Sequence, residues 1–177
     1  MDAVSKIIET LLYFVPALLV LGAVFLVVKK FLDNEHKLRL LDAKRAAQKE
    51  TVPLRLQAYE RMCIFLERIS PNSILVRTNK SGMSARELQS DLLVTIRTEF
   101  EHNLSQQIYM SSKSWEVIKN AKEDMVRIVN SAASSLGDNA TGVDLSKAIF
   151  EIVIKNEKIP TQRALDFLKN EIKQTLL

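Results

Sequence analysis

The chain has 177 residues, of which 47% are hydrophobic and 26% are charged, and its formal net charge is +4 at pH 7. The single cysteine excludes an intrachain disulfide and is typical of a reducing compartment. The charge is uneven, because residues 29–55 hold eight Lys and Arg against four Asp and Glu, whereas residues 56–177 hold sixteen against fifteen. A nearly balanced C-terminal part lacks the basic face that nucleic acids require, so we expect no nucleic-acid partner.

An uncharged stretch, TLLYFVPALLVLGAVFLVV, covers residues 10–28 and follows a short tail over residues 1–9. At ~1.5 Å per helical residue it reaches about 28 Å, close to the thickness of a bilayer's hydrocarbon core. A cleaved signal peptide would have a more basic start, a shorter apolar run and a small-residue cleavage site. The sequence therefore predicts one N-terminal transmembrane helix.

Lysine and arginine are frequent after this stretch, and only Lys6 precedes it. Because such residues stay on the cytoplasmic side of a span, we expect the N-terminus outside and the C-terminal part in the cytoplasm. Each cation near an anionic leaflet adds ~1 kcal/mol of attraction. The residues expected to contact lipid headgroups are Lys29, Lys30, Lys37, Arg39, Lys44 and Arg45.

Residues 29–52 predict a basic juxtamembrane helical connector. One heptad frame has apolar residues at only about half of its core positions, whereas a coiled coil needs a better-filled seam over several heptads. These positions are Phe31, Asn34, Leu38, Leu41, Arg45, Gln48 and Val52. The pattern favours a charged connector, and a coiled coil remains the alternative.

Residues 53–177 predict a compact cytosolic bundle of about five helices, so the fold class is all-α. Pro53 is expected to begin a new helix, since proline is tolerated in a first turn. Over residues 53–69 an apolar arc that includes Leu54 and Phe65 covers more than half of the circumference. The remaining strip is a candidate partner surface. It consists of Gln57, Glu60, Arg61, Ile64, Glu67 and Arg68.

The boundaries of the later helices are predicted from capping patterns. Ser84 and Glu87 form a capping box, and the helix that they open should continue to about Ile108 with Leu104 inward. Ser112 is expected to cap the next helix. Residues 74–77 are expected to be strand-like or a buried linker, and residues 149–154 have strand propensity although they fall within an expected helix.

Two loops, recognised by their glycine and proline residues, separate the expected helices in the C-terminal third of the chain. Gly137 should end one helix in the manner of a C′ glycine. Asp144 should cap the following helix, which is expected to end near Glu157. A last apolar stripe runs from Ala164 to Leu176.

The sequence offers little that indicates catalysis, so we expect neither an enzyme nor a cofactor. Glu99 and His102 form half of a carboxylate-bridged metal motif, whose second half is missing. A metal-dependent bundle enzyme is therefore a weak alternative. Cys63 lies within an apolar arc and is expected to be a structural thiol.

Two segments, QAYERMCIFLERISPNSILVR over residues 57–77 and EFEHNLSQQIYMSSKSWE over residues 99–116, resemble an uncharacterised family of small single-span membrane proteins from Bacteroidota-type bacteria. The resemblance covers nearly the whole chain. It implies a bacterial inner-membrane location and carries no assigned activity or functional residue.

The expected function is that of a membrane-tethered scaffold or accessory subunit, without catalysis, which contacts membrane lipid and other proteins. The chain also resembles, more crudely, the peripheral-stalk b-subunit of ATP synthases, which has one N-terminal span and a helical cytosolic part. A stalk-like oligomerising subunit is therefore the alternative, and it requires a long uninterrupted helix.

Overall fold

The computed structural model describes residues 2–155 and 159–175 and divides the chain into two compact units, Met1–Glu50 and Thr51–Leu177. Its elements are helices α1 to α6 and one 3-10 helix, η1. Apart from one isolated bridge between Ser84 and Thr141, the described residues contain no β-structure. The predicted all-α class is confirmed.

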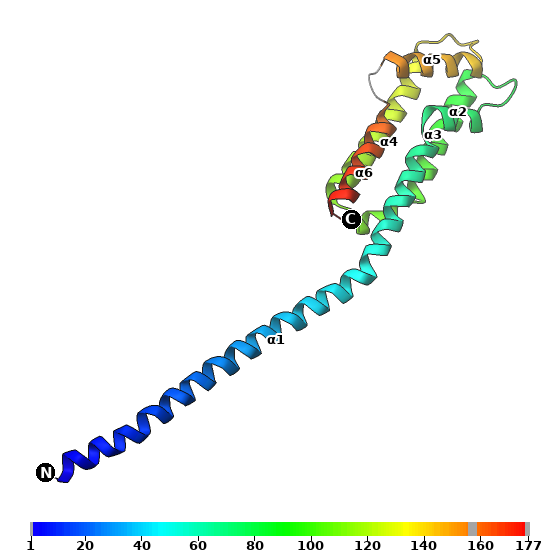
Figure 1. Ribbon diagram of the computed structural model, residues 1–177. Coiled ribbons are helices and arrows are strands. Elements are labelled where there is room, and N and C mark those ends of the chain that lie inside the picture. Colours follow the sequence, from blue (N-terminus) through cyan, green and yellow to red (C-terminus); the bar gives the residue numbers. More distant parts are fainter. Residues whose placement is uncertain (1, 156–158, 176–177) are drawn as a thin grey trace. The chain divides into compact units, whose positions relative to one another are not determined.

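The first helix, α1, runs without interruption over Asp2–Arg68 (Figure 1). Near the N-terminus it is long and apolar enough to cross a membrane. An 18-residue window there has a mean hydropathy of 2.8, and none of it is buried against the rest of the chain. The expected helix start at Pro53 is wrong. Proline removes only one helical hydrogen bond, the one that the carbonyl of Lys49 would accept, and both residues are exposed, so water can replace the missing donor.

Both segments that the sequence left open as possible strands are helical, and for residues 74–77 this differs also from the expected linker. Residues 74–77 lie in α2 (Pro71–Thr78), and residues 149–154 lie in α5 (Gly142–Lys155). In α2 the buried residues Pro71, Ile74, Leu75 and Thr78 follow the i, i+3, i+4, i+7 spacing of one helix face. Burial at helical spacing therefore outweighs the strand propensity of these residues.

Helix α3 (Ala85–Glu101) begins with the predicted capping box of Ser84 and Glu87, which is confirmed. The expected extension to Ile108 is wrong, because α3 ends at Glu101 and η1 (Leu104–Tyr109) follows. The side-chain amide of Asn103 donates to the carbonyl of Glu99 at 2.8 Å, a local bond that competes with further helix. Leu104, expected to point inward, is 40% exposed.

Helix α4 (Ser112–Ser134) starts one residue away from the prediction. Its N-cap is Ser111, whose hydroxyl accepts from the backbone N–H of Ser114 at 3.0 Å. The expected C′ role of Gly137 is also wrong, since the C-cap is Ser135 and Gly137 does not have positive φ. The hydroxyl of Ser135 instead donates to the carbonyl of Ala132 at 2.8 Å, which helps to end the helix.

The cap of α5 is Thr141 rather than Asp144. The Thr141 hydroxyl accepts from the backbone N–H of Asp144, whose carboxylate accepts from the backbone N–H and the hydroxyl of Thr141. Asp144 is thus the third residue of a capping box, and its predicted role as the cap itself is wrong. Helix α6 spans Pro160–Thr175, and the predicted positions Glu157 and Leu176 lie outside the described residues.

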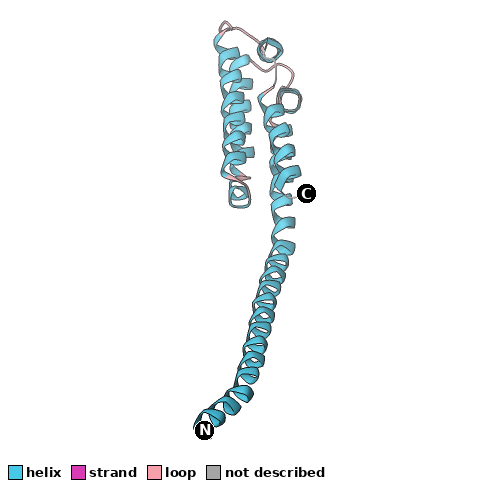
Figure 2. Ribbon diagram, turned by 60° about the vertical axis from the view of Figure 1, so that its left-hand side comes forward, coloured by secondary structure: helices cyan, strands magenta, loops and turns pink. Residues whose placement is uncertain are grey.

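Within the unit Thr51–Leu177, α4 packs against both α3 and α6, and the last part of α1 runs alongside these helices (Figures 1 and 2). Side chains of α1 reach α3 through Arg68 and Glu99, and α6 through Tyr59 and Glu171. Helices α2 and α5 cross one end of this bundle and contact each other. The apolar face of α1 is buried as expected at Ala58, Met62 and Phe65, but Leu54 is 47% exposed. The core therefore begins one turn later than predicted.

Candidate functional site

The predicted partner surface forms one exposed face on the C-terminal part of α1. All six of its residues are exposed, and Ile64 retains 50% of its accessible surface. The opposite face of the same helix is buried at Met62, Phe65 and Leu66. The amphipathic phase that the sequence predicts for this segment is therefore present.

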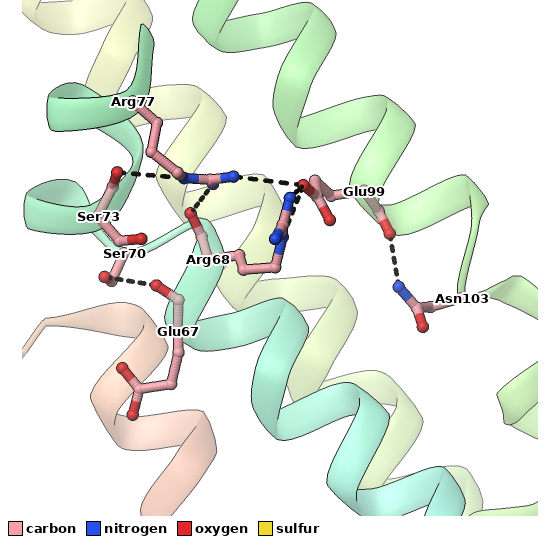
Figure 3. Close-up of polar contacts among 7 residues, drawn as sticks. All are labelled: Glu67, Arg68, Ser70, Ser73, Arg77, Glu99 and Asn103. Atoms are coloured by element: carbon pink, nitrogen blue, oxygen red, sulfur yellow. Dashed lines mark hydrogen bonds and ion pairs between the residues drawn. The ribbon is translucent and has the colours of Figure 1, made fainter.

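Arg68, at one end of this surface, is held within the chain by Glu99 of α3 (Figure 3). Oε1 of Glu99 accepts from Nε of Arg68 at 2.8 Å and also from its Nη2. A second guanidinium, that of Arg77 in α2, places Nη1 3.6 Å from the same oxygen. One carboxylate thus joins two arginines from the helices on either side of the α1–α2 turn.

This arrangement lowers the pKa of Glu99. Its carboxyl accepts a hydrogen bond from Arg68, and the charges of Arg68 and Arg77 act in the same direction, while partial burial opposes them. Glu99 is only 17% exposed, so its ionic contacts are screened less than those at an open surface. We conclude that Glu99 is ionised in the folded protein at neutral pH.

The same cluster satisfies carbonyl groups at the end of α1 and in the first turn of α2. Nη2 of Arg77 donates to the carbonyl oxygen of Arg68 at 2.6 Å, and its Nε donates to that of Ser73 at 3.3 Å. The hydroxyl of Ser70 donates to the carbonyl of Glu67 at 2.7 Å (Figure 3). A cation at a helix C-terminus also complements the helix dipole. Arg68 and Arg77 therefore have a structural role in the turn.

The two residues of the Glu-x-x-His motif are not brought together as ligands. Glu99 binds the two arginines, and His102 is the exposed C-cap of α3. No group of three or more His, Cys, Asp or Glu that could hold a metal occurs among the residues that the structure describes. Cys63 is half-buried, and burial raises the pKa of its thiol.

A buried polar cluster that the sequence analysis did not find joins α1, α4 and α6. Oε2 of Glu171 accepts from the hydroxyl of Tyr59 at 2.9 Å and from the hydroxyl of Ser114. Tyr59 and Ser114 are fully buried. The only sequence signal for this contact is a glutamate placed three residues after Leu168, on the edge of the apolar stripe of α6.

The six cations expected at lipid headgroups are exposed residues of the unit Met1–Glu50. Two of them have acidic neighbours on the same helix. Arg39 donates to Glu35 at 2.6 Å, and Arg45 lies 4.0 Å from Asp42. Exposed pairs at this spacing contribute only ~0.3–0.5 kcal/mol, so these arginines can still exchange partners at a charged surface.

A family model, that of a family of unknown function (DUF7935), matches residues 5–175. The chain belongs to this family. The match begins within the N-terminal part of α1 and continues into α6, so it covers the apolar stretch and the bundle together. No curated protein and no solved structure matches the chain.

Proposed function

We propose that this protein is a membrane-tethered interaction subunit of a bacterial inner-membrane assembly. Residues 10–28 of α1 would cross the membrane, with the N-terminus outside and the bundle in the cytoplasm. Support comes from the apolar window near the N-terminus and from the excess of lysine and arginine that follows it.

The observation that carries the interaction role is the exposure of Ile64. This apolar side chain is 50% exposed and lies among the charged residues Glu60, Arg61 and Glu67. An apolar centre with a polar rim is the usual anatomy of a protein–protein contact. Since Arg68 is bound to Glu99, the partner-facing residues are Gln57, Glu60, Arg61, Ile64 and Glu67.

A surface of this size gives a weak contact by itself. Attachment of both proteins to one membrane raises their effective concentration to roughly the millimolar range, so a weak contact suffices. The tether and the surface therefore belong to one mechanism, in which the span localises the bundle and the strip selects its partner.

Photocrosslinking in native membranes tests this proposal. A photoreactive residue at position 64 should give a crosslink to a second protein, and Ile64→Glu should shift the complex on native gels. Val94 of α3 is a matched control, because it is also apolar and is 57% exposed. If position 64 gives only intrachain products and Ile64→Glu leaves the native complex unchanged, this surface is not the partner site.

The continuity of α1 favours a second candidate, a stalk-like subunit. Residues 29–50 are helical throughout and, at ~1.5 Å per residue, reach about 33 Å beyond the apolar stretch. A stalk needs a stiff helix here, whereas a simple tether does not. Ala46→Gly combined with Ala47→Gly, at ~1 kcal/mol of helix propensity each, should disrupt the native-gel complex of a stalk. It should leave that of a tether intact.

A further inference from the structure

A row of apolar side chains on α1 remains exposed beyond the membrane-length stretch. Phe31, Leu38 and Leu41 are 66%, 53% and 51% exposed. They share one face of the helix, because their spacing follows a heptad repeat. Exposed apolar rows of this kind are usually covered by another surface.

The row continues without a break into the apolar stretch. In the same heptad frame the positions before Phe31 are occupied by Ala17, Val20, Val24 and Val27. These side chains are small or β-branched, whereas the bulkier Leu18, Leu19, Leu21 and Phe25 lie off the row. Small residues allow close helix approach within a membrane, and β-branched residues suit paired helices. From Tyr13 to Leu41 the only polar residue in the frame is Asn34.

The charges beside the row indicate what covers it. Lys30, Lys37 and Lys44 lie on one edge at intervals of seven, and Glu35 and Asp42 lie on the other edge at the same interval. In a parallel pair, a residue on the first edge faces the residue five positions later on the second edge of its neighbour. In this arrangement Lys30 faces Glu35 of a second copy, and Lys37 faces Asp42 of that copy.

The residues that follow Leu41 set the end of the pairing. Beyond Leu41 the frame places Arg45 and Gln48 in the row, and Lys44 would face Lys49. These residues would make the contact polar and repulsive there. Copies inserted in the same membrane orientation are necessarily parallel, so the antiparallel arrangement does not compete.

We infer that residues 13–42 of α1 form a parallel two-stranded contact with the same residues of a second copy of this chain. The inference rests on the stalk-like candidate of the proposed function and names the second copy as its helical partner. Outside the apolar stretch the contact covers only about two heptads, which is short for a free coiled coil. Confinement of both copies to one membrane compensates for this.

Disulfide crosslinking of the full-length protein in native membranes tests the contact, in a Cys63→Ser background. Leu41→Cys lies in the row, and its neighbour Leu40→Cys lies off the row although Leu40 is 60% exposed. Facing core positions approach closely enough for a disulfide. We expect at least about tenfold more linked dimer from Leu41→Cys than from Leu40→Cys.

Equal yields from the two positions, or no linked dimer from Leu41→Cys, would overturn the inference. If Leu41→Cys crosslinks only to a different protein, self-pairing is wrong while the stalk-like candidate stands. Crosslinking from position 64 is an independent readout, so failure of the dimer and failure of the partner strip are distinguishable.

Charge exchange in the Leu41→Cys background tests the parallel register. Lys37→Glu alone places like charges opposite each other, as does Asp42→Lys alone, and each should lower the dimer yield several-fold. The two changes together restore opposite charges between positions 37 and 42, so the yield should recover. A double variant as weak as the single variants contradicts the proposed register.

Discussion

The guanidinium of Arg77 donates to the backbone carbonyl oxygen of Arg68 at a distance of 2.6 Å. Two like-charged residues are thereby brought together at the turn between α1 and α2. Glu99 makes this possible, since its carboxylate contacts both guanidinium groups. The end of the long helix α1 is thus fixed to α3 as well as to α2, and the exposed strip on α1 has a rigid support.

The first prediction concerns the pH dependence of this cluster. Because the pKa of Glu99 is lower in the folded state than its ordinary value of 4.5, its contribution to stability is present above that value. It is lost as the pH falls through the folded-state pKa. Glu99→Gln should lower the free energy of unfolding of residues 51–177 by about 1–2 kcal/mol at pH 7.

Urea titrations at pH 7 and pH 3 measure this effect. The difference in the free energy of unfolding between wild type and Glu99→Gln should narrow below pH 4.5. Glu101→Gln, a change at an exposed residue, serves as the control. A difference that stays constant across this range would show that the charge of Glu99 is not what stabilises the turn.

The second prediction concerns the core beneath the strip. Phe65 is fully buried and its ring centroid lies 5.7 Å from that of Phe100, which in turn stacks on Trp115 at 5.4 Å. Phe65→Ala should therefore destabilise residues 51–177 by ~3–5 kcal/mol. Glu67→Ala, on the exposed face, should change stability by less than about 1 kcal/mol. Equal effects of both changes in urea would contradict the helical phase.

The helical phase of α1 was predictable because burial follows a 3.6-residue period that a single sequence displays. Helix ends were less predictable, since they depend on individual hydrogen bonds. Ser111 rather than Ser112 accepts the first-turn N–H of α4, and Asn103 rather than a glycine or proline accompanies the end of α3. Neighbouring residues with similar capping ability are distinguished only by tertiary position.

The third prediction concerns the buried polar cluster of α1, α4 and α6. The hydroxyl groups of Tyr59 and Ser114 donate to the same oxygen of Glu171. Tyr59→Phe should lower the free energy of unfolding by about 1.5–3 kcal/mol, as expected for a hydrogen bond to a carboxylate. Since the two donors share one acceptor, the double change with Ser114→Ala should differ from the sum of the single changes by at least about 0.5 kcal/mol. Strict additivity in urea titrations would show that the donors act independently.

The candidate site was only partly accessible from the sequence. The exposed strip around Ile64 follows from helical periodicity, which is a local property of the chain. The binding of Arg68 to Glu99 joins residues 31 positions apart, and that of Tyr59 to Glu171 joins residues 112 apart. Contacts at such separations depend on how the helices pack, and no local pattern in this sequence specifies them.

The fourth prediction concerns membrane topology. The excess of lysine and arginine after residue 28 predicts that the C-terminus is cytoplasmic. Alkaline phosphatase fused after the last residue should therefore be inactive, and a fluorescent protein at the same position should be bright. An active phosphatase fusion would show that the bundle is on the periplasmic side.

Two glycines near the start of α3 and α5 resist side chains for different physical reasons. Gly82 has φ +83°, and no atom lies within 4 Å of the position that a methyl group would occupy. At Gly142 the methyl group of alanine would meet the carbonyl oxygen of Met83 at 3.2 Å. The first position is limited by chirality and the second by space. L-alanine at position 82 should therefore lower the melting temperature through backbone strain, although its methyl group has room. L-alanine at position 142 should lower the melting temperature because its methyl group crowds the neighbouring backbone.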